Sequence, residues 1–169
     1  MADTSLTQLE KLYNLPDPLL AFRWVCTYLP FDLPPHYMEA IDLPVNNIAA
    51  GEQVYAGGKF FKFPGTHSLG SFTSTIYEDR NGRGLKWIEE WKSKVKNFKT
   101  GSYGLPKAYK QAIVVSLLDN KNNKVITARI IGVWPTDTNP MSLNYTDGTA
   151  RIAHQQTFEA DDVELTFHR

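Results

Sequence analysis

The chain has 169 residues, which is enough for one domain with its own hydrophobic core, so neither a metal nor a disulfide is needed to hold it together. Its 18 basic and 18 acidic residues give a formal net charge of zero, which argues against a dedicated nucleic-acid binder, because such proteins gain affinity from clustered Lys and Arg. The single cysteine excludes an intramolecular disulfide and favours a reducing cytoplasm, and no apolar run is long enough for a membrane span.

Residues 1–17 are expected to form an N-terminal arm, and residues 18–169 a single β domain. The arm carries Leu6, Leu9, Leu12 and Tyr13 at helical spacing, but it is short and ends at Pro16. It has neither a basic start nor an apolar run, so we expect no secretory signal.

The first half of the domain alternates bulky and small side chains. Residues 19–29 are expected to form a strand, and residues 31–44 contain three prolines that favour extended or turn backbone. Residues 53–63 predict a hairpin around Gly57 and Gly58, because both positions can adopt positive φ. Its second arm places Phe61 and Phe63 on one side and Phe60 on the other, so we expect these aromatics to meet another subunit.

The side chains of residues 71–78 alternate as in a further strand, and the spacing of the apolar residues then changes to that of a helix. Leu85, Ile88, Trp91 and Val95 recur every three or four residues, which predicts one amphipathic helix with Asp79 or Asn81 as its cap.

Residues 111–136 form the centre of the predicted fold, because two β-rich runs flank one polar turn at residues 119–123. Alternation places Ile126, Ala128, Ile130 and Trp134 on the face of the second run that we expect to be core. The opposite face carries Val125, Thr127, Arg129, Ile131 and Val133. Because that face is also partly apolar, we expect another sheet, a helix or another copy to cover it.

The C-terminal part predicts a short strand at residues 141–145, a turn at residues 147–148, and either a strand pair or one long strand over residues 153–167. The alternation of apolar residues shifts from even-numbered to odd-numbered positions at Asp161 and Asp162, which predicts a bulge or turn there. Seven or eight antiparallel strands with one helix indicate a mainly β fold, either a β-sandwich or an open barrel.

No pattern of catalytic or metal-ligating residues emerges. The histidines at 36, 67, 154 and 168 lack metal-ligand spacing, and Asp161, Asp162 and Glu164 lack the loop pattern of a calcium site. Cys26 lies in an aromatic strand and is expected to be a buried structural thiol. Lysines at 86, 92, 94, 96 and 99 are expected on the solvated face of the helix. We therefore expect no enzyme activity, no cofactor and no metal.

Taken in order, these segments resemble the tail tube proteins of contractile-tailed bacteriophages, from about residue 18 to the end. The resemblance is carried by DPLLAFRWV at 17–25, Leu43-Pro44, the glycine turn with Pro64-Gly65 after it, SFTSTIYED at 71–79, the helix with Trp87 and Trp91, KAYKQAIVV at 107–115, IIGVWPT at 130–136 and QQTFEADDVEL at 155–165.

The resemblance implies a structural subunit that forms hexameric rings, each subunit lending strands to an inner β-barrel. The rings would stack into a tube inside a contractile sheath, with baseplate proteins at one end and the tape measure protein and viral DNA in the lumen, without sequence-specific binding. It implies a virion tail assembled in the host cytoplasm.

Three alternatives remain. Residues 29–41 and the tail after Glu164 look longer than the usual family pattern, which suits a specialised tube-end or baseplate tube-initiator subunit. The tube of a bacterial secretion or injection system has the same fold class. A monomeric β-sandwich that binds a carbohydrate or another ligand would use the exposed aromatics as a platform.

Overall fold

A computed structural model describes residue 16 and residues 18–168, so the predicted N-terminal arm lies almost entirely outside the described residues. The described elements are β1 (Trp24–Tyr28), a 3-10 turn (Pro35–Tyr37), β2 (Met38–Ile41), β3 (Asn46–Tyr55), β4 (Lys59–Leu69), β5 (Phe72–Tyr77), α2 (Arg83–Val95), α3 (Pro106–Tyr109), β6 (Gln111–Leu118), β7 (Lys124–Thr138), β8 (Ala153–Glu159) and β9 (Asp162–Phe167).

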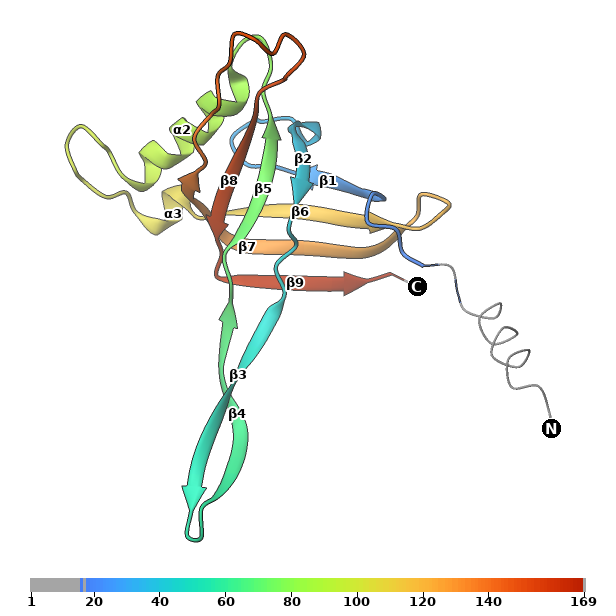
Figure 1. Cartoon of the computed structure of the whole chain (residues 1–169), viewed down its shortest axis with the longest axis vertical. Coiled ribbons are helices and arrows are strands. Elements are labelled where there is room, and N and C mark those ends of the chain that lie inside the picture. Colours follow the sequence, from blue (N-terminus) through green and yellow to red (C-terminus); the bar gives the residue numbers. More distant parts are fainter. Residues whose placement is uncertain (1–15, 17, 169) are drawn as a thin grey trace, which may run out of the picture.

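The strands form two layers that share one long strand. The first layer, the inner sheet, has the order β1-β6-β7-β9, and the second layer, the outer sheet, has the order β7-β8-β5-β2. Every pairing is antiparallel. The hairpin β3-β4 forms a separate two-stranded sheet that projects away from both layers (Figure 1). The mainly β architecture with a flanking helix is confirmed.

The core lies between the two sheets and is closed at one end by α2. Trp91 is fully buried against Trp87 and Phe158, and the Phe158 ring stacks on Phe72 at 5.5 Å. The Trp91 indole also donates a hydrogen bond to the Tyr109 carbonyl at 2.7 Å, which ties α2 to α3. Of the four periodic residues that predicted α2, Ile88 and Trp91 are fully buried, whereas Leu85 and Val95 are half-buried. Trp87, which the periodicity did not select, is also part of the core.

The strand β7 changes face at Gly132, which the simple alternation missed. Gly132 has φ +70°, a left-handed conformation that favours glycine, and the pairing with β6 is irregular between Gln111 and Ile113. As a result Val133 is fully buried, although alternation placed it on the face opposite Ala128 and Ile130, which are buried as predicted.

Two further local predictions need correction. Residues 141–145 form no strand and belong to a loop that contains Asn144 and Asp147 turns. In the proline-rich stretch, β2 was not predicted. It pairs with β5 as the edge strand of the outer sheet. The turns at residues 119–123 and at Asp161 lie where the sequence predicted them.

Candidate assembly interface

The inner sheet has two free edges, β1 and β9. Within residues 18–168 no strand pairs with the outer side of either one. Four antiparallel strands lie side by side, so the two edge strands run in opposite directions. Unpaired sheet edges are strong sites for pairing with another chain.

The backbone groups on these edges point outward at defined residues. At the end of β9, the His168 amide donates a hydrogen bond to the Val125 carbonyl of β7. In an antiparallel pair every second residue bonds the partner strand, so residues 164 and 166 also bond β7. The residues between them, Leu165 and Phe167, therefore direct their N–H and C=O groups outward. The outward carbonyl of Val163 accepts a hydrogen bond from the Asn46 side chain, which confirms this direction. On β1, the Leu118 amide of β6 donates a hydrogen bond to the Arg23 carbonyl. Because bonded and outward-facing residues alternate, the backbone groups of the next residue, Trp24, point outward.

Side chains at the two edges share one face of the inner sheet. Leu165 lies opposite Ala128, and Trp24 is in register with Ile126 through Leu117. Both residues therefore lie on the core side, where Leu165 and Phe167 remain 40% and 67% exposed at the margin. A strand added at either edge would cover apolar side chains as well as unpaired backbone.

The opposite face of the inner sheet is more polar than the sequence suggested. Ser116 and Thr127 share a hydroxyl contact of 3.2 Å, and Arg129 pairs with Glu164 at 4.0 Å, with both side chains about 60% exposed. The expectation that a helix or second sheet of the same chain covers this face is therefore wrong, because Arg129, Glu164 and Val25 are exposed to solvent.

The β3-β4 hairpin has no core of its own. Its residues are almost all exposed, and at its base the Asn46 side chain bonds Val163 on β9. A two-stranded hairpin is marginal in water without a packing partner. It runs past the β9 edge, away from the body of the subunit (Figure 1).

The structure places the five residues predicted for subunit contacts at the outer half of this hairpin. Gly57 and Gly58 have φ +90° and +73° and make the tight turn. Register puts Phe61 and Phe63 on one face, where Tyr55 packs edge-on against Phe61 at 6.2 Å, and Phe60 on the other. The three phenylalanines are 41–65% exposed, so both faces present apolar surface.

A buried polar cluster at the start of α2 escaped the sequence analysis. The Glu78 carboxylate accepts bonds from the Gly84 and Leu85 amides at 2.9 and 2.8 Å and from His154 Nε2 at 2.5 Å. Desolvation of Glu78 raises its pKa, but these bonds outweigh it and the net pKa is lowered. Asp79, one of the two predicted caps, accepts the Arg83 amide, while Asn81 does not cap. The His154 side chain is fully buried and the Glu78 side chain is 11% exposed, so the cluster lies at the edge of the core beneath the start of α2.

Charge is divided unevenly along the neutral chain. Residues 83–110 hold eight basic and two acidic side chains, so this segment has an excess of six positive charges and the rest of the chain an equal negative excess. Within the described residues, Glu89 and Glu90 pair with Lys92 and Lys86, which leaves the lysines at 94, 96, 99 and 107 without a carboxylate partner. Lys86 and Lys94 are exposed on α2 as predicted, and Lys99 is exposed in the loop between α2 and α3. The prediction was wrong for Lys92, whose side chain is 15% exposed and donates a hydrogen bond to the Thr138 hydroxyl.

Among residues 18–168 no group of three or more His, Cys, Asp or Glu side chains is arranged to hold a metal ion. Over the same part of the chain, no helix has the length and apolarity to cross a membrane. Cys26 is buried in β1, and desolvation raises the pKa of its thiol to about 11, so it is a poor nucleophile.

Comparison with known proteins gives matches in structure alone. No family model matches the sequence, and no curated protein matches it. In the anti-feeding prophage cap, the tube-terminating cap, a chain shares 18% identity with a TM-score of 0.71, covering 91% of this chain and 94% of that one.

Two other matches come from other parts of such particles. A chain in the sheath-tube complex of an extracellular contractile injection system, PVC, in the extended state has 18% identity and a TM-score of 0.67, with 99% and 100% of the two chains covered. A chain in the six-fold symmetrised baseplate of the anti-feeding prophage has 11% identity and a TM-score of 0.65, with 90% and 98% covered.

These matches run over nearly the whole chain and include both sheets. They confirm the resemblance to tail tube proteins at the level of the fold. The chain has the tube fold found in contractile injection systems.

Proposed function

We propose that the chain is a structural subunit of a contractile tube, in which copies join into closed rings and rings stack inside a sheath. The observation that supports this proposal best is the inner sheet with its two free edge strands, β1 and β9, which run in opposite directions. The residues whose backbone groups point outward from these edges have their side chains on the same face of the sheet. A rotated copy can therefore add its β9 to β1 and continue both the antiparallel order and the apolar face.

The ring is expected to contain six copies, in keeping with the six-fold symmetrised baseplate that holds a similar chain. The inner sheets would then form a continuous barrel, with the polar face of Thr127, Arg129 and Glu164 towards the lumen. The paired charges on that face suit a conduit that viral DNA and a tape measure protein pass without binding. Such a tube belongs to a virion tail, or to an injection particle of related design, assembled in the host cytoplasm with sheath and baseplate partners.

In this assembly the β3-β4 hairpin covers a neighbouring copy. It projects past the β9 edge, where the next subunit docks, and Phe60, Phe61 and Phe63 supply apolar contacts around the Gly57-Gly58 turn. Residues 18–169 act as the single assembling domain and residues 1–17 as an arm.

A tube-end subunit is the second candidate, and the match to a chain of the tube-terminating cap favours it. The two candidates differ in growth: a tube subunit forms long rods on its own, whereas a cap forms single rings that stop rods of another subunit.

The proposed edge pairing is tested by Leu165→Pro. The Leu165 amide points away from β7, so proline removes a donor that only a neighbour would use. We expect the variant to remain a folded monomer by light scattering, while the wild type forms rings or rods in negative-stain images. Thr166→Pro is the matched control, because it removes an amide bonded to β7 and destabilises the subunit itself.

Concentrated wild-type protein that stays monomeric would reject the proposal and favour the ligand-binding module. Rings of normal yield from Leu165→Pro would reject the edge pairing. If Leu165→Pro unfolds, Phe167→Asp supplies a second test, because the Phe167 side chain is 67% exposed at the same edge.

A further inference from the structure

The loop between α2 and α3 presents apolar side chains from an ordered backbone. Phe98, Tyr103 and Leu105 are 69–76% exposed. The loop is nevertheless fixed: the Asn97 amide donates to the Ser102 carbonyl at 2.9 Å, and the Gly104 amide donates to the Val95 carbonyl at 2.9 Å. A preordered loop loses little conformational entropy on binding, so its exposed aromatics are suited to contact a partner.

Phe98 stands at the tip of this loop, between Asn97 and Lys99. The Asn97 side chain accepts the amides of Lys99 and Thr100, which closes the turn around Phe98. The Lys96 ammonium lies 5.0 Å from the centre of the Tyr103 ring, which holds the loop together from the other side. The tip therefore offers one free aromatic ring with positive charge beside it.

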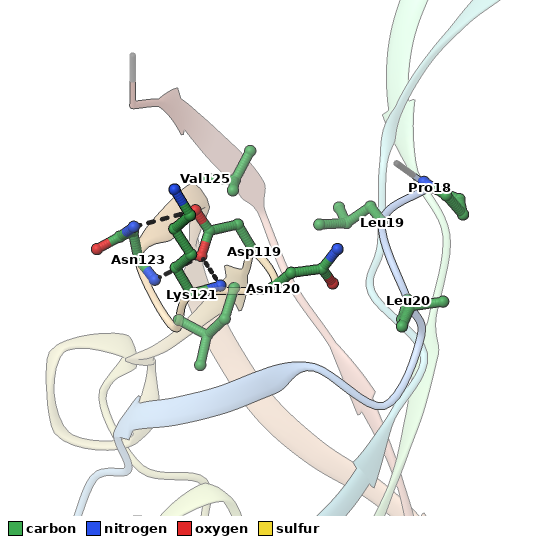
Figure 2. Close-up of a pocket in the computed structure, with 9 residues that line it drawn as sticks. Pro18, Leu19, Leu20, Asp119, Asn120, Lys121, Asn123 and Val125 are labelled. Carbon is green, nitrogen blue, oxygen red and sulfur yellow. Dashed lines mark hydrogen bonds between the residues drawn. The ribbon is translucent and has the colours of Figure 1, made fainter. Parts of the chain in front are cut away.

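A pocket of about 470 Å³ lies at the opposite end of β6. Its apolar wall consists of Leu19, Leu20, Leu118 and Val125, and its rim is the turn from Asp119 to Asn123. Figure 2 shows Leu19 and Leu20 across the opening from this turn. The volume falls in the range of pockets that take small ligands, so it can hold an aromatic side chain.

The charged groups at the pocket are Asp119 and Lys121. Bonds from the Asn123 amides hold the pKa of Asp119 below its ordinary value, with the Lys121 amide adding to the effect. Asp119 is therefore ionised at neutral pH and can attract Lys99, whereas Lys121 projects from the same rim and must turn outward.

The loop and the pocket lie at the two ends of one strand. β6 begins at Gln111, with one residue between it and the end of α3, and ends at Leu118, which forms part of the pocket. The two features stand at opposite ends of the inner sheet (Figure 1). The eight residues of β6 separate them by about 25 Å.

We propose that the 96–105 loop of one copy inserts Phe98 into the 118–125 pocket of a copy in the next ring. The inference rests on the proposed function, because closing the inner sheets into a barrel turns the two ends of β6 towards the two rims. Rings stacked in the same orientation then bring loops against pockets. Such a head-to-tail contact repeats without limit and builds a rod.

The first experiment is a disulfide trap in the Cys26→Ser background, using Phe98→Cys with Leu20→Cys. A disulfide requires Cα atoms within about 7 Å, so oxidation links copies into covalent ladders only if the loop reaches the pocket. Phe98→Cys with Leu143→Cys is the matched control, because Leu143 is 75% exposed at another site and no ladder is expected. Rods that give no ladder with Leu20→Cys would overturn the proposal.

The second experiment changes stacking without changing the ring. Phe98→Ser with Leu105→Ser is expected to leave rings intact and to shorten rods at least tenfold in negative-stain images, whereas Leu143→Ser leaves them unchanged. Rods of wild-type length from the double variant would overturn the stacking contact and leave the proposed function standing. A wild type that forms no rings would instead reject the proposed function, and the stacking contact with it.

Discussion

Glu78→Ala tests whether one carboxylate anchors the start of α2. The Glu78 side chain is 11% exposed, and Gly82, at the N-terminal boundary of the helix, supplies no side-chain cap. The substitution leaves the amides of Gly84 and Leu85 and the buried His154 ring without their acceptor. Loss of an N-cap costs about 1 kcal/mol and an unpaired buried donor about 1–3 kcal/mol, so we expect a loss of about 2–4 kcal/mol.

The assay is urea unfolding followed by circular dichroism and tryptophan fluorescence, because Trp87 and Trp91 lie in α2. Glu90→Ala is the control. Its carboxylate is 61% exposed and pairs with Lys86 at 3.7 Å, so the expected change is within about 0.5 kcal/mol.

The stability lost in Glu78→Ala is expected to depend on pH in one direction. Because the folded pKa of Glu78 lies below its ordinary value of 4.5, the stabilisation is present above that value and is lost as pH falls through the folded pKa. The difference between wild type and Glu78→Ala should therefore shrink as pH is lowered from 6 towards 3. A loss no larger than that of Glu90→Ala, or a difference that does not change with pH, would refute the reasoning.

Three other variants check separate parts of the structure. Gly132→Ala should cost about 1–3 kcal/mol in urea unfolding, because φ is +70° and a Cβ would meet the Asp161 carboxylate; equal stability of Gly132→Ala and Gly70→Ala would contradict this. Trp91→Ala should cost about 3–5 kcal/mol, since the ring is fully buried, and a loss under 1 kcal/mol would show that the core is not built on it. Phe61→Ser with Phe63→Ser should leave the monomer's urea midpoint unchanged and block tube growth in negative-stain images, and normal tubes from this variant would disprove the hairpin contact.

Local patterns predicted much of this fold because they reflect forces that act within a few residues. The periodicity of Leu85, Ile88 and Trp91 located α2, and the Gly57-Gly58 turn located the hairpin. The change of parity at Asp161 located the turn before β9. In each case one face of the element or one tight turn dictates the residue type.

The errors lie where distant residues decide the outcome. β2 forms between Pro35 and Pro44 because β5 offers an edge to pair with. Val133 turns inward because of the backbone of Gly132, which alternation ignores. The contact between Glu78 and His154 joins residues 76 positions apart. The available signal was a carboxylate shortly before a helix that lacks its own capping side chain.

The long strand β7 has a mechanical consequence. Its first part belongs to the inner sheet and its last part to the outer sheet, which carries α2. A force applied to the inner sheet is therefore transmitted along covalent backbone, through the kink at Gly132, to the outer sheet that carries the helix. The turn between β8 and β9 joins the same two layers a second time, so the layers cannot slide past each other without stretching both connections.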